Sequence, residues 1–142
     1  MKNAVEIEPR YSDTDQMGVI YHGNYFSYFE IARTNLFEVL GYSYRQIEDE
    51  GIILPVTEAN CRYKKAIKYG EKIIVEAEVD FIKRVTIGFN YTIYRKSDEE
   101  VLATGYTHHG FVSKDLKPVR FKDFNPDFQK VLKRLKNKNE WS

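Results

Sequence analysis

Residues 11–37 read YSDTDQMGVIYHGNYFSYFEIARTNLF, and this stretch decides the expected fold. A polar segment with two aspartates, a glycine and a histidine runs directly into a segment with helical spacing. Apolar residues recur there every three or four positions, and they are Tyr25, Phe29, Ala32, Leu36 and Leu40. Further apolar residues widen this stripe, namely Phe26, Ile31, Phe37 and Val39. The sequence predicts a helix over residues 23–40 that is buried on most sides and is closed by Gly41.

Strand-like segments lie on both sides of this helix. They are residues 4–11, 52–67, 73–82, 85–95 and 101–113. Pro9 places the first strand at an edge or near an end, because proline cannot donate to a sheet. A short helix over residues 44–50 stops at Gly51, and KSDEE at residues 96–100 is expected to be a hairpin turn.

Two of these segments alternate with a period of two, which is typical of strands with one buried face. In residues 73–82 the apolar set is Ile73, Val75, Ala77, Val79 and Phe81. In residues 85–95 it is Val85, Ile87, Phe89, Tyr91 and Ile93. Asn125 and Pro126 provide the start of a C-terminal helix. The predicted fold class is α+β, with antiparallel strands packed around one helix.

The overall composition excludes several classes of function. A chain of 142 residues with 42% hydrophobic and 30% charged residues is expected to form a single domain, residues 1–142. The net charge of +1 gives no general attraction to nucleic acid or to a membrane surface. The single Cys61 excludes an internal disulfide. No membrane-spanning run and no signal peptide are visible, so a cytoplasmic location is expected.

The segment before the helix has two interpretations. Aspartates are common in turns and as helix caps, and this is the simpler reading of SDTDQMG. Alternatively, the free amides at the start of the helix lie beside His22 and within reach of Asp15. Gly23 would let a ligand approach the backbone. A carboxylate, an imidazole and polarising amides together would suit acyl transfer.

The quoted stretch resembles the 4-hydroxybenzoyl-CoA thioesterase-like branch of the hotdog fold. That branch has a D-x-D-x-x-G run, then Tyr or His, a small residue, Asn and Tyr, and then an aromatic-rich helix with an E-x-A-R segment. RYKKAIKYGEKIIVEAEV at residues 62–79 also resembles the family, and the resemblance covers about residues 5–115. It implies a five-stranded antiparallel sheet wrapped around a long central helix, a homodimer or homotetramer, and hydrolysis of acyl-CoA.

The resemblance also implies roles for individual residues. Asp15 matches the catalytic aspartate, acting as nucleophile or general base. His22 matches a position that is Tyr or His in the family, and Tyr11 matches a tyrosine near the carboxylate. Asn24 and Tyr25 begin the helix whose amides would face the thioester oxygen.

Asp13 and a group of basic residues have interpretations of their own. Asp13 is interpreted as a turn or structural residue. Arg62, Lys64 and Lys65 belong to a basic cluster that either forms a solvated edge or contacts the phosphates of coenzyme A.

Other interpretations are weaker. A non-catalytic module that binds acyl-CoA or an acyl carrier protein would lack the Asp15 carboxylate, and a hotdog dehydratase would place its residues differently along the helix. A metal site from Asp13, Asp15 and His22 lacks a recognisable ligand spacing. His108 and His109 are adjacent on a strand and therefore point to opposite faces. No metal, cofactor or nucleic-acid partner is predicted, and Cys61 has no apparent base partner.

Overall fold

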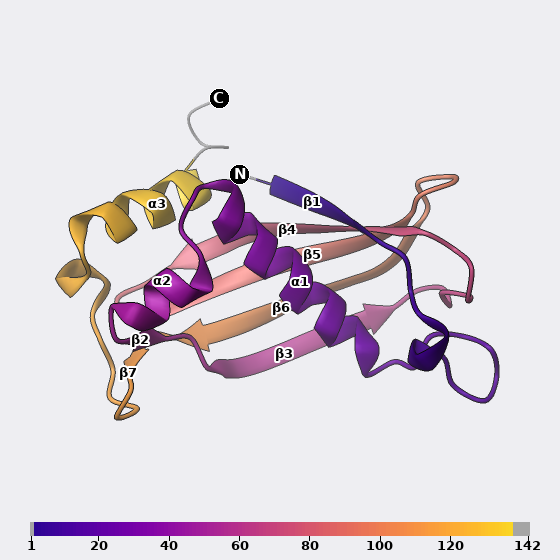
Figure 1. Ribbon diagram of the computed structural model, residues 1–142, viewed down its shortest axis with the longest axis horizontal. Helices are drawn as coiled ribbons and strands as arrows, with labels where there is room; N and C mark the ends of the chain where they lie inside the picture. Colours follow the sequence, from indigo (N-terminus) through magenta and orange to yellow (C-terminus); the bar gives the residue numbers. More distant parts are fainter. Residues whose placement is uncertain (1, 138–142) are drawn as a thin grey trace.

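The computed structural model describes residues 2–137 and contains a five-stranded antiparallel sheet in the order β1-β4-β5-β6-β3 (Figure 1). The strands are β1 (Lys2–Ile7), β3 (Val56–Tyr63), β4 (Ile73–Ile82), β5 (Thr86–Arg95) and β6 (Val101–Gly110). Two short strands, β2 (Ile52–Ile53) and β7 (Val112–Ser113), pair separately. The predicted five-stranded antiparallel sheet is confirmed, and β1 is an edge strand as Pro9 indicated.

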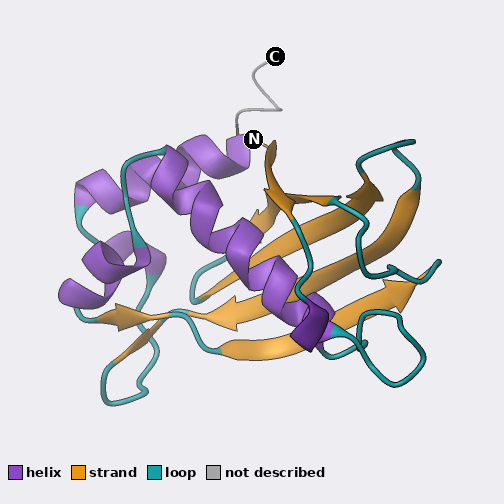
Figure 2. Cartoon of the chain, turned by 45° about the vertical axis from the view of Figure 1, so that its right-hand side comes forward, coloured by secondary structure: helices purple, strands orange, loops and turns teal. Residues whose placement is uncertain are grey.

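The described helices lie on one side of this sheet and at one of its ends (Figures 1 and 2). They are α1 (Asn24–Val39), α2 (Tyr44–Asp49) and α3 (Pro126–Asn137), with 3-10 turns η1 (Tyr11–Asp13) and η2 (Phe121–Asp123). The helix α1 has 16 residues and crosses one face of the sheet. No described helix is long and apolar enough to cross a membrane.

Local signals explain where the helices begin and end. Ser43 and Gln46 form a reciprocal capping box at the start of α2. The Asn125 side chain accepts a hydrogen bond of 2.8 Å from the amide of Asp127, which confirms it as the cap of α3. Gly41 follows α1 with a φ of +76°, a backbone conformation that glycine adopts without strain.

The core lies between α1 and the face of the sheet that α1 covers. Phe29 of α1 stacks on Tyr91 of β5, with ring centroids 4.4 Å apart. The apolar alternation of β5 is confirmed, because Ile87, Phe89, Tyr91 and Ile93 are all buried. The inward residues of α3 extend the same core, and they are Phe128, Leu132 and Leu135.

The alternation predicted for β4 is correct only as far as Val79. A register shift between Val79 and Phe81 places Phe81 opposite Gly88, on the outer face of the sheet. Such a bulge adds one residue and reverses the direction of the side chains beyond it. Phe81 therefore covers Gly88 and packs edge-on against His108 on the outer face, with ring centroids 4.9 Å apart. The pattern of residue types alone does not reveal a bulge.

Three predicted strands have different bounds in the structure. The first begins at Lys2 and ends at Ile7, before Pro9. The segment 52–67 divides into β2 and β3 around Pro55, which has no amide to donate. The segment 101–113 divides at Phe111 into β6 and β7, because the chain there changes its pairing partner from the main sheet to β2.

The helix α1 is less buried in this single chain than its sequence predicts. Phe37 is fully buried, but Phe26, Ile31 and Val39 are 36%, 45% and 51% exposed. The expectation of burial on most sides is therefore wrong for the isolated chain. Ile31 and Val39 lie about two turns apart on the exposed side of α1, whereas Phe26 lies near its start on another side. Exposed apolar side chains of this size can be covered by another molecule.

Candidate active site

The loop before α1 is held in place by backbone hydrogen bonds. The amide of Asp15 donates to the carbonyl of Val19 at 2.8 Å, and the amide of Ile20 donates to the carbonyl of Ile67 at 2.8 Å. Gly18 occupies the tip with a φ of +80°. The loop is therefore fastened to the segment that connects β3 with β4, and Asp15 sits on a defined backbone.

Only one oxygen of the Asp15 carboxylate is used by this loop. Its Oδ1 accepts from the amide of Met17 at 2.7 Å and from the amide of Val19 at 3.4 Å. Within residues 2–137, Oδ2 has no hydrogen-bond donor or cation partner. The side chain is half-buried. One oxygen of Asp15 therefore makes the hydrogen bonds expected of a turn residue. The second oxygen remains available for a substrate or a water molecule.

His22 lies among aromatic rings at the entrance to α1. Its ring is 4.4 Å from that of Tyr21 and 6.1 Å from that of Tyr63, measured between centroids. The hydroxyl of Tyr63 donates to the backbone carbonyl of His22 at 3.0 Å. Burial raises the pKa of Tyr63 to about 12, and Cys61 acts in the same direction, so this hydroxyl stays protonated at neutral pH.

A shallow pocket of about 280 Å³ brings most of the predicted site together. Its lining consists of Asp15, Met17, Val19, Ile20, His22, Tyr25, Tyr63, Lys64, Lys65 and Ala66. Five predicted residues thus share one pocket although they come from the loop, from α1 and from the segment after β3. Tyr63 is one of five lining residues that sequence reasoning missed, with Met17, Val19, Ile20 and Ala66, and it is the one whose hydroxyl bonds to His22. The signal was present, since strand alternation from Cys61 places Tyr63 on the same inner face.

The amides of Asn24 and Tyr25, predicted to polarise a carbonyl, already have partners. Asn24 donates to the carbonyl of Tyr21 at 3.0 Å, and Tyr25 donates to the carbonyl of His22 at 3.2 Å. The preceding amides, those of His22 and Gly23, donate to no acceptor in the described part of the chain. Unpaired amides at the positive end of a helix dipole attract a developing negative charge.

Gly23 also has a packing role within the loop. A β-carbon at this position would come within 2.7 Å of the Tyr21 ring. The space beside its α-carbon is therefore already occupied by Tyr21. The absence of a side chain lets Tyr21 fold back beside His22, and Gly23 does not itself line the pocket.

Two predicted residues lie away from this pocket. Tyr11 is 75% exposed in η1, and its ring packs edge-on against Tyr69 with centroids 5.5 Å apart. Arg62 pairs with Thr104 on the outer face of the sheet, one residue out of phase with Tyr63. Neither side chain lines the pocket that contains Asp15.

The two lysines of the predicted basic cluster do reach the pocket. The amides of Lys64 and Lys65 both donate to the carbonyl of Leu102, at 2.9 and 3.0 Å, which fixes their backbone beside β6. The amino group of Lys65 forms an ion pair with Glu100. Lys64 has no ion-pair partner among the described residues. Lys64 is therefore the better placed of the two to meet an incoming anion.

Asp13 differs from Asp15 although the two are separated by one residue. Its Oδ2 accepts from the hydroxyl of Tyr28 and from the amide of Arg10, both at 3.0 Å. Desolvation and this hydrogen bond shift the pKa of Tyr28 upward. Asp13 thus fastens η1 to α1, which agrees with its interpretation as a structural residue.

The histidines of β6 are held by protein groups on opposite faces, as predicted. His109 is fully buried, with Nδ1 2.9 Å from the carbonyl of Leu54 and Nε2 2.8 Å from the Thr107 hydroxyl. His108 stacks against Tyr106 on the outer face. Within residues 2–137, no cluster of three or more His, Cys, Asp or Glu residues is arranged to hold a metal ion.

Comparison with known proteins places this geometry in a family. The family model of the thioesterase-like superfamily matches residues 9–132. A putative acyl-CoA thioesterase of Bacillus subtilis, YneP, is 34% identical over 92% of this chain and 95% of that protein. A 1,4-dihydroxy-2-naphthoyl-CoA hydrolase of Thermosynechococcus vestitus is 29% identical over 70% of this chain and 68% of that protein.

Solved structures agree with this placement. A DHNA-CoA thioesterase from Staphylococcus aureus superposes with a TM-score of 0.92 and 39% identity, covering 99% of this chain and 95% of that one. A 4-hydroxybenzoyl-CoA thioesterase complex has a TM-score of 0.80 at 14% identity over 92% of this chain and 97% of that one, which shows a shared fold alone. The chain has the hotdog fold and belongs to the thioesterase-like superfamily.

Proposed function

We propose that this protein hydrolyses an acyl-CoA thioester to a free acid and coenzyme A. The observation that carries the proposal is the pocket lined by Asp15 and His22 at the entrance to α1, because the Oδ2 of Asp15 and the amides of His22 and Gly23 have no partner in the described chain. The names of the similar proteins support thioester chemistry. Thioesters need little help from an acid, because a thiolate is a good leaving group.

The proposed mechanism uses Asp15 as the reacting carboxylate. Either its Oδ2 attacks the thioester carbon and water then hydrolyses the mixed anhydride, or it removes a proton from the attacking water. In both routes the C–S bond breaks, the thiolate is protonated, and one water is consumed. The thioester oxygen would lie at the amide of His22, the one of the two unpaired amides whose residue lines the pocket. This assignment replaces Asn24 and Tyr25, whose amides are already bonded.

The remaining pocket residues would hold the substrate. Lys64 is proposed to meet a phosphate of coenzyme A, since its amino group has no ion-pair partner in the described chain. The His22 ring is proposed to orient the carbonyl or the water. Tyr63 fixes the His22 backbone through its hydrogen bond and so positions the amide of that residue.

Substitution of Asp15 by Asn tests the proposal. The amide side chain keeps an oxygen that can accept from the amides of Met17 and Val19, so the loop should keep its shape. It cannot act as nucleophile or base, so kcat for the best acyl-CoA should fall by at least ~100-fold. The measurement is steady-state release of thiol over a panel of acyl-CoAs, with a melting curve for each protein.

The matched control is Asp115→Asn, because Asp115 is an exposed carboxylate outside the pocket. This variant should hydrolyse at the wild-type rate. Full activity in Asp15→Asn would remove Asp15 from the mechanism. A wild-type protein that binds acyl-CoA but releases no thiol with any substrate would instead identify a binding module.

The active form is proposed to be a homo-oligomer built on the edge strand β3. The pocket of about 280 Å³ is at the lower limit for small-molecule sites and lies at the open end of β3, beside Tyr63. Nearly every residue of β3 is exposed, including Val56 at 54%. A second copy along this edge would enlarge the pocket and cover the exposed strand.

The hydrogen-bond phase of β3 supports this arrangement. The amide of Lys64 donates to the carbonyl of Leu102, and the register pairs Tyr63 with Ala103. Hydrogen-bonded positions alternate in an antiparallel pair, so every second amide before Lys64 points toward β6. The amides of Ala59, Cys61 and Tyr63 therefore point away from the sheet. They form a row of unpaired donors that a second strand can use.

A further inference from the structure

The turn that follows β7 carries an exposed leucine in a backbone conformation that leucine rarely adopts. Leu116 has a φ of +62° and is 69% exposed. This left-handed region is unfavourable for a bulky side chain, and glycine is the usual residue there. A strained residue whose side chain remains in solvent does not stabilise the core of its own chain. Such a position indicates a role outside the single chain.

Hydrogen bonds hold this turn on a defined support. The amide of Leu116 donates to the carbonyl of Ser113 at 2.8 Å, and the amide of Ser113 donates to the carbonyl of Lys117 at 2.8 Å. Nearer the sheet, the amide of Gly110 donates to the carbonyl of Pro55 at 3.1 Å, which ties this part of the chain to the residue before β3. Leu116 therefore projects from a fixed turn beside the start of β3.

The turn after β7 and the loop that carries Asp15 lie at opposite ends of β3. In Figures 1 and 2, β3 forms the lower edge of the sheet, and both segments extend below it. The strand runs from Val56, near β7, to Tyr63, which lines the Asp15 pocket. Each end of the free edge therefore carries one projecting segment.

Antiparallel pairing of β3 with the same strand of a second copy exchanges these two ends. Identical strands that pair in this way are related by a two-fold axis perpendicular to the sheet. The Val56 end of one copy then lies beside Tyr63 of the other. The turn after β7 of one copy is brought to the Asp15 loop of the other. This step uses the homo-oligomer proposed above.

The Asp15 pocket has exposed apolar side chains where the turn would arrive. Met17 lines this pocket and is 81% exposed, and the ring of Tyr63 is also exposed to solvent. Leu116 and Met17 are thus large apolar side chains that project from opposite ends of one free edge. Contact between two copies would remove both of them from water, which favours association.

We propose that Leu116 of one copy closes the Asp15 pocket of the second copy, in contact with Met17, and packs against the acyl group of the bound thioester. The acyl group that meets this wall is then apolar. An aliphatic side chain selects such a group by its size and not by hydrogen bonds. The role toward the acyl group rests on the proposed function, whereas the contact between the copies does not.

Cross-linking tests the contact without using hydrolysis. Cys61 is the single cysteine of the chain, so a Cys61→Ser background leaves only introduced thiols. In that background, chains with Leu116→Cys and chains with Met17→Cys are co-expressed and treated with a short bis-maleimide. A covalent dimer should form when both variants are present and not with either variant alone.

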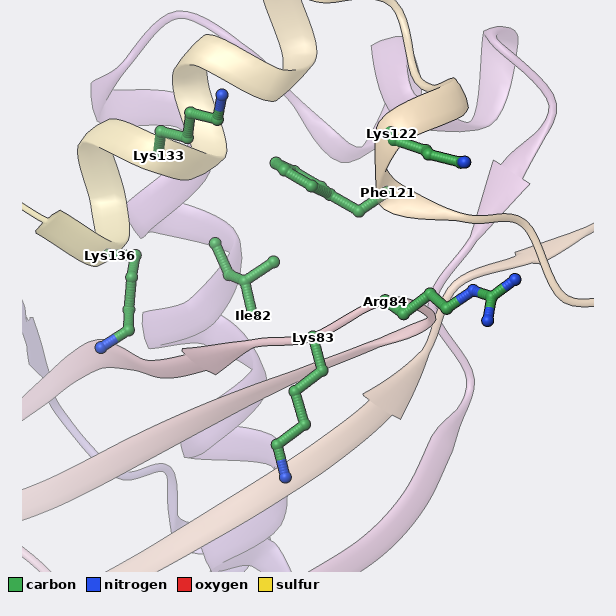
Figure 3. A pocket seen from close by; sticks show the side chains of 7 residues that line it. All are labelled: Ile82, Lys83, Arg84, Phe121, Lys122, Lys133 and Lys136. Atoms are coloured by element: carbon green, nitrogen blue, oxygen red, sulfur yellow. The ribbon is translucent and has the colours of Figure 1, made fainter.

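The control for cross-linking is Lys133→Cys, paired with Met17→Cys. Figure 3 shows Lys133 on α3 above Ile82 of β4, at the same end of the sheet as β7. The strands β5 and β6 separate β4 from β3, so this thiol lies away from the free edge. The control pair should give no covalent dimer.

Substitution of Leu116 by Gly separates a functional role from a structural one. Glycine adopts this φ without strain, so the variant should melt at the wild-type temperature or above it. The value of kcat/KM for the best acyl-CoA should nevertheless fall about 10-fold, because the pocket loses an apolar wall. The control Glu99→Gly relieves the same kind of strain, at a φ of +59° in the turn after β5, outside the pocket. It should keep the wild-type kcat/KM, as should Asp115→Asn, which leaves Leu116 in place.

Co-expression of Asp15→Asn with Leu116→Gly shows which chain supplies the leucine. In the purified heterodimer, one site combines the intact Asp15 of one chain with the intact Leu116 of the other. That site should therefore reach the wild-type kcat/KM. If Leu116 acted on its own chain, the same site would keep the loss seen in Leu116→Gly.

Three results would overturn the proposal. They are a cross-link yield no higher than that of the Lys133→Cys control, a wild-type kcat/KM in Leu116→Gly, and a heterodimer that keeps the loss. The proposed function fails in a different way. A wild type that releases no thiol from any acyl-CoA, while the Leu116→Cys and Met17→Cys chains still cross-link, would overturn that function and support the contact.

Discussion

At the scale of single residues, two aspartates in one loop have separate tasks. The Oδ1 of Asp13 pairs with the guanidinium of Arg10, and its Oδ2 accepts hydrogen bonds from the Arg10 amide and the Tyr28 hydroxyl. Asp15 uses one oxygen for its own loop and leaves the other without a partner in the described chain. The spacing of the two acids indicated a site, but this difference depends on where Tyr28 of α1 lies, which local sequence does not specify.

The choice of amide donors shows the same limit. The sequence locates the start of α1 within one residue, yet the unpaired amides belong to His22 and Gly23 because Tyr21 and His22 carbonyls accept from Asn24 and Tyr25. The unpaired amides thus lie two residues before the predicted pair, because the turn at residues 21–25 already bonds the amides of Asn24 and Tyr25. This shift changes which atoms would face a substrate.

A buried polar chain gives a testable dependence on pH. The guanidinium of Arg33 donates to Tyr44 and Tyr91, and the chain continues through Thr107 to His109. Burial lowers the pKa of His109 from 6.5 to about 4, and the charge of Arg33 acts in the same direction. His109 is therefore neutral in the folded protein at neutral pH.

The sign of the effect follows from the lowered pKa. The unfolded chain takes up a proton at His109 near pH 6.5 and the folded chain only near pH 4, so stability is complete above pH 6.5 and falls as the pH drops through this window. Between pH 7 and pH 5 the wild type should lose about 2 kcal/mol from this group. The free energy of unfolding in urea measures this loss.

The variant His109→Gln should be less stable at pH 7 but should lose about 2 kcal/mol less than the wild type between pH 7 and pH 5. The matched control is His108→Gln, which changes the partly exposed neighbour on the outer face. Identical pH profiles for the wild type and His109→Gln would mean that His109 does not resist protonation in the folded state.

At the scale of elements, two glycines in neighbouring strands tolerate a methyl group differently. A β-carbon at Gly105 in β6 would lie 2.5 Å from the backbone carbonyl of Asn60 and 2.6 Å from the buried ring of Phe29. At Gly88 in β5 its three nearest atoms would all belong to the ring of Phe81, a partly exposed side chain on the outer face. Backbone and core atoms cannot move aside, whereas Phe81 can rotate toward solvent.

Gly105→Ala should therefore cost about 3 kcal/mol of unfolding free energy, and Gly88→Ala less than ~1 kcal/mol. Chemical denaturation of both variants beside the wild type measures the difference. Because the substitution is the same in both, equal costs would contradict the assigned contacts of Phe29 and Phe81.

The elements themselves could be predicted in type, but with errors at their ends. Apolar periods identified α1, β4 and β5, and Asn125 with Pro126 marked the start of α3. The bulge that turns Phe81 outward was missed because residue types on both sides of it are apolar. The pairing partners of β2 and β7 depend on tertiary contacts, so the local patterns included both in longer strands and did not separate them from β3 and β6.

At the scale of the whole molecule, the exposed apolar residues of α1 were predicted to be covered, and β3 leaves a second exposed region at the edge of the sheet. The sequence counted Phe26, Ile31 and Val39 as buried, and in the single chain they are exposed. A second copy would reconcile the pattern with the structure. The family resemblance also implied an oligomer, and this part of the prediction stays open to experiment.

Substitution of Ala59 by Pro tests the oligomer at β3. The amide of Ala59 points away from β6, so a proline at this position removes no hydrogen bond within the chain. The proline does remove a donor from the free edge, and its ring lies where a pairing strand would approach. The wild type should sediment as a dimer or larger species at micromolar concentration, and Ala59→Pro should shift toward the monomer. Turnover should fall with it, because the small pocket beside Tyr63 would lose its second wall. The control Ala59→Ser keeps the amide and should behave as the wild type. A wild-type monomer with full activity would exclude both the oligomer and a shared site, while an Ala59→Pro variant that stays oligomeric would move the interface away from β3.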